Sequence, residues 1–187
     1  MLRLLIDTSV WLDLAQRRDG QKWIVPMRVF MHEKHLQLLV PALVIKEFDR
    51  NRPRAEDAVT VKVQDRFRPI RNDLSAFADD ERRQEWLQEM THYITFVSAM
   101  TLQNFSEISD LLHAGKTITP TDKDRSRVIQ RGLEKKAPLH QNKNSVADEL
   151  LIEMYRTQVA RSRDKGNEYC FVTSNFQDFS MPVPVPE

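Results

Sequence analysis

The chain contains few of the residues that mark secreted, membrane-spanning or nucleotide-binding proteins. It has 187 residues, with one cysteine and four glycines. The single cysteine, Cys170, excludes an intramolecular disulfide and fits a reducing compartment. No apolar run is long enough for a membrane-spanning helix, and the apolar stretch before Asp7 is too short for a signal peptide. No glycine-rich phosphate loop occurs, so a nucleotide site is not expected. These absences favour a cytoplasmic protein with one domain over 1–187 and no membrane contact.

Charge is nearly balanced overall but unevenly distributed. The formal net charge is +1. Residues 50–71 hold seven Lys and Arg against three acids, and residues 116–143 hold eight against three. Such segments suit a polyanionic partner, although solvated helix faces have the same composition. Composition leaves both interpretations open.

Short apolar runs alternate with helical patterns. Residues 3–6 predict a short buried strand, 36–41 form a second short apolar run, and 168–174 predict a further buried strand. The predicted helices cover 9–17, 21–35, 42–51, 55–68, 80–103, 105–113, 121–136 and 145–162, with a linker at 114–120. This alternation predicts an α/β fold with a short central parallel sheet flanked by helices.

Four acidic residues stand in unusual places. Asp7 and Asp178 each follow an apolar strand, whereas Glu47 and Asp148 lie on helices beside apolar residues. Each has a structural alternative when it is taken alone. Glu47 could pair with a cation at the edge of its stripe, and Asp148 could form a capping box with Ser145. Asp178 could belong to a turn or cap.

Together, the four acids indicate a metal site. Ligands bind at the carboxyl ends of parallel strands, and this topology would bring Asp7, Glu47, Asp148 and Asp178 to one such edge. Crowded carboxylates repel one another unless a cation neutralises them. Carboxylate oxygens suit Mg²⁺ or Mn²⁺. We therefore expect the four carboxylates to converge on one pocket.

Four segments resemble the motifs of PIN-domain nucleases, in the same order and with similar spacing. They are "LLIDTSVWLDL", "VPALVIKEF", "KNSVADELLIE" and "FVTSNFQDF". The resemblance covers about 1–52 and 117–181. It implies a three-layer PIN fold, a divalent metal, and cleavage of RNA phosphodiester bonds. It assigns metal-binding and catalytic roles to Asp7, Glu47, Asp148 and Asp178, and substrate-positioning roles to Thr8, Ser9, Ser174 and Asn175.

Two features depart from that pattern. Many family members have Asp where this chain has Asn175, so either Asn175 or Asp178 could reach the metal. Residues 53–116 resemble a helical insertion between the second and third motifs. Their stripe of Trp86, Met90, Tyr93, Val97 and Met100 has helical spacing. The simpler interpretation is that this stripe packs on the core, and the alternative is a surface for a partner or for RNA.

The leading functional hypothesis is a metal-dependent endoribonuclease, either toxin-like or RNA-processing. The basic residues Arg127, Arg131, Lys135 and Lys143 are predicted to contact the RNA backbone. A protein inhibitor or antitoxin, and a homodimer, are further expected partners. The alternative is a catalytically silent PIN-like module that binds RNA or a protein. A phosphatase built on Asp7 ranks last, because such enzymes need a second Asp where Ser9 stands.

Overall fold

The computed structural model describes residues 1–77, 81–134, 146–161 and 166–175. The first described range, 1–77, contains five helices and strands, the last of which is a very long helix. In chain order, the elements are β1 (Leu2–Ile6), α1 (Thr8–Gln16), α2 (Gln21–His32), β2 (Leu36–Pro41), α3 (Ala42–Phe77), α4 (Glu81–Ala114), β3 (Lys116–Ile118), α5 (Asp122–Leu133), α6 (Val146–Ala160) and β4 (Glu168–Val172).

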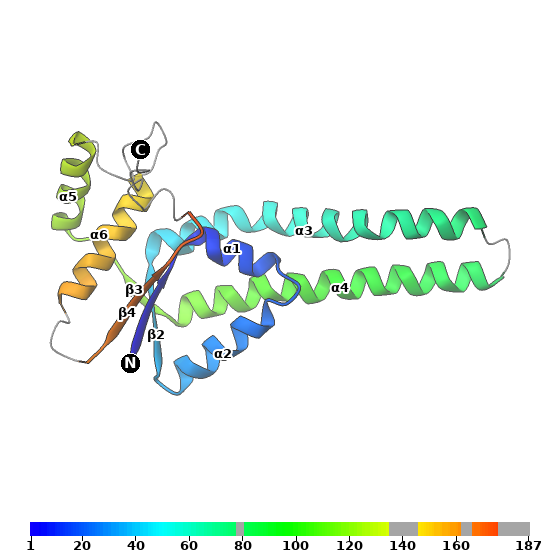
Figure 1. Ribbon diagram of the computed structural model, residues 1–187, viewed down its shortest axis with the longest axis horizontal. Coiled ribbons are helices and arrows are strands. Elements are labelled where there is room, and N and C mark those ends of the chain that lie inside the picture. Colours follow the sequence, from blue (N-terminus) through cyan, green and yellow to red (C-terminus); the bar gives the residue numbers. More distant parts are fainter. Residues whose placement is uncertain (78–80, 135–145, 162–165, 176–187) are drawn as a thin grey trace, which may run out of the picture.

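The strands form one parallel sheet in the order β3-β2-β1-β4 (Figure 1). β1 lies between β2 and β4, with Leu4 paired to Leu38 on one side and Leu5 paired to Phe171 on the other. An inner strand is covered on both faces, which explains the nearly continuous apolar run at 2–6. The predicted α/β fold with helices around a parallel sheet is confirmed.

The carboxyl ends of the strands share one edge of the sheet. β1 ends at Ile6, just before Asp7, and β2 leads directly into α3. α6 and β4 run in opposite directions (Figure 1), and Tyr155 of α6 packs against Phe171 of β4 with ring centroids 5.7 Å apart. The first turn of α6 therefore lies toward the same edge as Asp7. This edge is where an open parallel sheet binds ligands.

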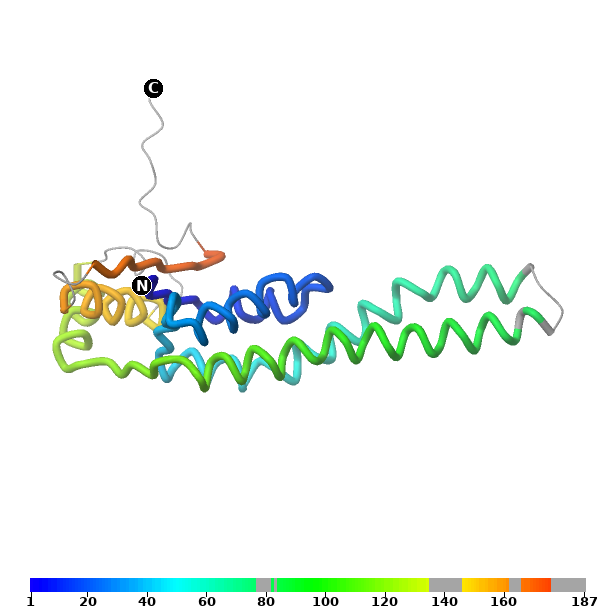
Figure 2. Tube along the Cα trace, turned by 90° about the horizontal axis from the view of Figure 1, so that it is seen from below, coloured from blue at the N-terminus to red at the C-terminus, as the bar shows by residue number. Residues whose placement is uncertain are grey.

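Helices α3 and α4 pack along each other and extend far beyond the sheet (Figures 1 and 2). We call their part beyond the sheet the arm. The sequence predicted separate helices at 42–51 and 55–68, and again at 80–103 and 105–113, but each pair is continuous. Pro53 and Pro69 lie inside α3 although an interior proline costs about 3 kcal/mol. Packing of Val59, Val63 and other α3 residues in the core offsets that cost.

A buried amide joins the base of α4 to the turn between α1 and α2. Asn104 is almost fully buried, and its Nδ2 donates to the backbone oxygen of Arg17 at 2.9 Å. Its Oδ1 accepts from Gln21 Nε2 at 2.8 Å. A Cβ at Gly20 would lie 2.8 Å from both Asn104 Nδ2 and the backbone oxygen of Leu14, so glycine is required at this close approach. The arm is therefore fixed to the sheet domain by hydrogen bonds as well as by apolar packing.

Two predictions at the arm and after it were wrong. The linker predicted at 114–120 contains β3, which pairs with β2 from Leu39 to Pro41. Three residues are too few to show strand periodicity in a sequence. In the stripe, Met90 and Val97 are half-buried, but Trp86, Tyr93 and Met100 are each about half exposed. The stripe is thus divided between a face that meets α3 and a face that meets solvent.

Candidate functional site

Asp7 lies at the carboxyl end of the central strand and does not act as a helix cap. It occupies the N-cap position of α1, where an Asp side chain normally accepts a backbone hydrogen bond from the first turn. Its carboxylate makes no such bond. The residue is only 4% exposed. Its burial is therefore not explained by capping, and its partners lie elsewhere.

Hydroxyl groups from two parts of the chain bind the Asp7 carboxylate. Ser9 Oγ donates to Asp7 Oδ2 at 2.6 Å, and Thr173 Oγ1 donates to the same oxygen at 3.2 Å. Ser174 Oγ then donates to Ser9 Oγ at 2.7 Å, and the backbone N–H of Asn175 donates to Thr173 Oγ1. Hydrogen bonds to a carboxylate hold its orientation. The structure thus brings the predicted residues Asp7, Ser9, Ser174 and Asn175 into one hydrogen-bonded group.

Glu47 comes to the same edge from α3, in the second turn after β2. Thr8 Oγ1 donates to Glu47 Oε2 at 2.9 Å. Because Thr8 directly follows Asp7, this hydrogen bond holds Glu47 at the strand end where Asp7 lies. Glu47 Oε1 lies 3.8 Å from Arg50 Nη2. Glu47 is half-buried, and its hydroxyl and guanidinium partners compensate its charge.

Asp148 lies in the first turn of α6 and is half-buried. It shares a helix face with Tyr155, seven residues later, which contacts β4. Asp178, Lys135, Lys143 and the capping partner Ser145 lie outside the described residues. Within the described ranges, no three His, Cys, Asp or Glu side chains gather closely enough to hold a metal ion. The complete set of four acids is therefore not contained in these ranges, and it stays a prediction.

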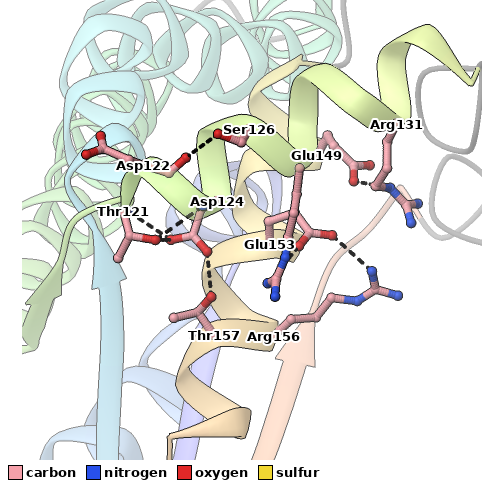
Figure 3. Close-up of polar contacts among 10 residues, drawn as sticks. Thr121, Asp122, Asp124, Ser126, Arg131, Glu149, Glu153, Arg156 and Thr157 are labelled. Atoms are coloured by element: carbon pink, nitrogen blue, oxygen red, sulfur yellow. Dashed lines mark hydrogen bonds and ion pairs between the residues drawn. The ribbon is translucent and has the colours of Figure 1, made fainter.

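The predicted cations of α5 face α6 and pair with its acidic side chains (Figure 3). Arg131 pairs with Glu149, which is fully buried. Arg127 Nη1 lies 3.4 Å from Glu153 Oε2, and Arg156 Nη1 lies 2.9 Å from Glu153 Oε1. Because Glu149 and Glu153 balance their charges, Arg127 and Arg131 have a structural role that their predicted contact with RNA did not include.

The buried acids between α5 and α6 differ in their electrostatics. Burial raises the pKa of Glu149 above its ordinary value, and the nearby Glu153 adds to this, while Arg131 opposes it. Asp124 is also buried, which by itself raises its pKa, but hydrogen bonds from Thr157 and Thr121 outweigh burial and lower it. Thr121 and Asp124 form a capping box at the start of α5 (Figure 3). The pattern Thr-x-x-Asp in the sequence could have predicted this cap.

A comparison with models of protein families matches residues 4–179 to the PIN domain. The chain belongs to the PIN domain family. The match includes α3 and α4, so both long helices lie within the family domain. No curated protein and no solved structure shows significant similarity to the chain.

PIN domains are typically nucleases and commonly use divalent metals, and the donors at the sheet edge of this PIN domain suit such an ion. Asp7 and Glu47 offer carboxylate oxygens, and Thr8, Ser9 and Thr173 offer hydroxyl oxygens. Hard oxygen donors without sulfur or imidazole are typical of Mg²⁺ and Mn²⁺ sites. Among the described helices of this PIN domain, none is long and apolar enough to cross a membrane.

Two contributors to these sites were not predicted from the sequence. Thr173 belongs to the fourth motif, and the hydrogen bond from its hydroxyl to Asp7 is the first. The pairing of β1 with β4 indicates this contact. Val172 pairs with Ile6, so the residues that follow them, Thr173 and Asp7, must lie side by side. The acidic face of α6 was the second omission. Glu149, Glu153 and Arg156 are spaced by four and three, which places them on one helix face that could have been matched to Arg127 and Arg131.

Proposed function

We propose that this PIN domain is a metal-dependent ribonuclease whose site lies at the carboxyl edge of the sheet, around Asp7. One observation carries the proposal. A nearly buried aspartate ends the central strand, does not cap the helix that follows, and is held by hydroxyls from α1 and from the end of β4. Buried carboxylates without a structural purpose are concentrated at functional sites.

The residues at this edge have distinct roles in the proposal. Asp7 and Glu47 hold a divalent cation, with Asp148 and Asp178 as the predicted further ligands. Such a cation supplies charge that activates water and stabilises the oxygens of the reacting phosphate. Ser9 and Thr173 keep the Asp7 carboxylate in one orientation. Asn175 is exposed, and its side-chain amide offers hydrogen-bond donors to a phosphate, while the exposed Ser174 holds Ser9 in place.

A row of cations on α3 leads away from this edge and suits an RNA backbone. Lys46, Arg50 and Arg54 are exposed and spaced by four, so they share one helix face. We call them the basic row. Arg50 lies beside Glu47, and Lys46 and Arg54 make no ion pair within the described part of the chain. The basic row is a better candidate for phosphate contacts than α5, whose Arg127 and Arg131 are paired with buried acids.

A nuclease assay on defined RNA tests the proposal. Wild-type protein should cleave single-stranded RNA with Mn²⁺ or Mg²⁺ and should stop when the metal is chelated. Asp7→Asn should lower the rate about 100-fold or more, because a metal ligand contributes several kcal/mol to transition-state stabilisation. Asp13→Asn, an exposed acid on α1, is the matched control. RNA binding without any metal-dependent cleavage would instead support the catalytically silent module.

A further inference from the structure

The arm exposes a row of large apolar side chains on α4. Trp86, Tyr93, Phe96 and Met100 are 51%, 50%, 55% and 47% exposed. The neighbouring face of α4, with Met90, Ile94 and Val97, is half-buried toward α3. Monomeric proteins seldom expose a contiguous apolar patch of more than a few hundred Å². α4 therefore has one apolar face that α3 covers and a neighbouring face that stays half exposed among the described residues, with an edge contact of the Tyr93 ring on Phe67 of α3 at 5.8 Å between centroids.

The exposed row has the spacing of a coiled-coil seam. Trp86, Tyr93 and Met100 recur every seven residues, and Glu89 and Phe96 complete a repeat of three and four. We call these five residues the outer row. Surface hollows flank Tyr93, one shared with Trp86 and Phe67 and the other with His92 and Phe96. Side chains beside such hollows are suited to knobs-into-holes packing with a facing helix.

We propose that the outer row binds the outer row of a second copy of this chain, with the two α4 helices antiparallel about Tyr93 and the two arms forming a four-helix bundle. Trp86 and Met100 each lie seven residues from Tyr93, and Glu89 and Phe96 lie four before it and three after it, so the row is nearly symmetric about this residue. In an antiparallel pair, Trp86 therefore faces Met100 of the second copy. Such a self-complementary contact closes on itself as a twofold dimer. This inference is independent of the proposed nuclease activity.

The only acidic member of the row favours the antiparallel arrangement. Glu89 lies four residues from Tyr93, so the two Glu89 side chains in the dimer are about 12 Å apart along the helix axis. That separation exceeds the screening length of about 8 Å at physiological salt. A parallel pair would place the two Glu89 carboxylates face to face, which is destabilising. α3 is less suitable as the contact helix, because exposed cations such as Arg66, Arg68 and Arg71 lie along it.

The available area is sufficient for a stable contact. An aromatic side chain buries 150–250 Å² in total, so four half-exposed large side chains leave about 400 Å² per chain to be covered. Two chains then bury about 800 Å² of apolar surface. With the usual polar share, the whole interface is about 1,300 Å². Stable protein–protein interfaces of standard size begin near about 1,200 Å².

Molar mass and cysteine crosslinking of the full chain test the proposal. Light scattering over a dilution series should give twice the chain mass of 22.0 kDa. Phe96→Glu with Met100→Glu should give a monomer with unchanged helical circular dichroism, because both side chains are half exposed. α2 offers a matched control in Trp23→Glu with Phe30→Glu, which also places charges on exposed apolar residues. A monomeric wild type, or a dimer broken only by the α2 variant, would overturn the proposal.

Crosslinking reports the orientation. The chain has one native cysteine, so Cys170→Ser provides a clean background. Tyr93→Cys should form a disulfide-linked dimer on oxidation, whereas Val61→Cys on α3 should not. A mixture of the Trp86→Cys and Met100→Cys chains should crosslink, and each of these alone should not. Efficient crosslinking of Trp86→Cys with itself would show a parallel pair and contradict the arrangement.

Discussion

Thr173 and Asp7 lie 166 residues apart in the chain and share a hydrogen bond of 3.2 Å between the threonine hydroxyl and Asp7 Oδ2. This contact joins the ends of two neighbouring parallel strands at one carboxylate. Ser9 binds the same oxygen from the start of α1. The carboxylate orientation is thus set before any ion or phosphate binds, which reduces the cost of organising the site.

Metal binding should stabilise the wild-type protein through Asp7. At a Mn²⁺ concentration of 100 times the dissociation constant, the free energy of unfolding should rise by about 2.7 kcal/mol. Asp7→Asn should remove most of this increase while changing the stability without metal by about 1 kcal/mol or less. Chemical denaturation with and without Mn²⁺ measures both quantities. An Asp7→Asn protein that is still stabilised by Mn²⁺ as strongly as the wild type would place the ion elsewhere.

Removal of the basic row should weaken RNA binding. Lys46→Ala, Arg50→Ala and Arg54→Ala together should lower the affinity for single-stranded RNA. Each lost phosphate contact should reduce the slope of log K against log salt by about 0.7. Alanine preserves helix propensity, so α3 should remain intact. Binding titrations over a range of salt concentrations give the slope.

A matched triple variant on the same helix controls for charge alone. Arg66→Ala, Arg68→Ala and Arg71→Ala remove three exposed cations farther out along the arm. These changes should leave RNA affinity nearer to that of the wild type. Equal losses of RNA affinity in the two triple variants would mean that RNA binding depends on the overall charge of the protein and not on contacts with the basic row.

Arg131→Ala should destabilise the fold because it leaves the carboxylate of Glu149 buried without its partner. Breaking a buried ion pair from one side costs about 3–5 kcal/mol. Burial already raises the pKa of Glu149, and loss of Arg131 should raise this pKa further. A raised carboxyl pKa means that stability is retained in acid and lost as the pH rises through the folded-state value. The free energy of unfolding that Arg131→Ala loses relative to the wild type should therefore grow with pH.

Arg125→Ala is the control for Arg131→Ala. Arg125 pairs with Asp122 on the same helix, and both side chains are mostly exposed. Its removal should change stability little at any pH. Denaturation curves could show the same loss in free energy of unfolding for both variants. The pairing of Arg131 with buried Glu149 would then not be what stabilises the α5–α6 contact.

Asp124→Asn should weaken the junction of α5 and α6. The Asp124 carboxylate accepts hydrogen bonds from Thr121 at the helix cap and from Thr157 on α6. Loss of a charged acceptor in this position should cost about 1–3 kcal/mol at neutral pH. Because the folded-state pKa is lowered, this stability is present above the ordinary value of about 3.9 and is lost as the pH falls through the folded-state value. Unfolding curves of wild type and variant should therefore converge in acid, whereas Asp122→Asn should match the wild type.

Local patterns in the sequence determined which segments form the inner strands and that the fold is a parallel α/β arrangement. Residues 3–6 predicted a buried strand just before Asp7, and the apolar run at 36–41 predicted the strand that leads to Glu47. The parallel α/β arrangement followed from their alternation with helices. These features depend on neighbouring residues, so periodicity alone was sufficient to predict them.

Only the tertiary structure decided which partner each helix face meets. Helical spacing placed Arg127 and Arg131 on one face, but the acidic face of α6 gave that face a structural role. The stripe on α4 had correct helical spacing too, yet Tyr93 lies half exposed because α3 covers the adjacent face. The Thr173–Asp7 contact depends on strand register between distant segments. Sequence periodicity gives the angle of a side chain around its own helix or strand, whereas its contacts depend on how distant elements pack, which no local pattern contains.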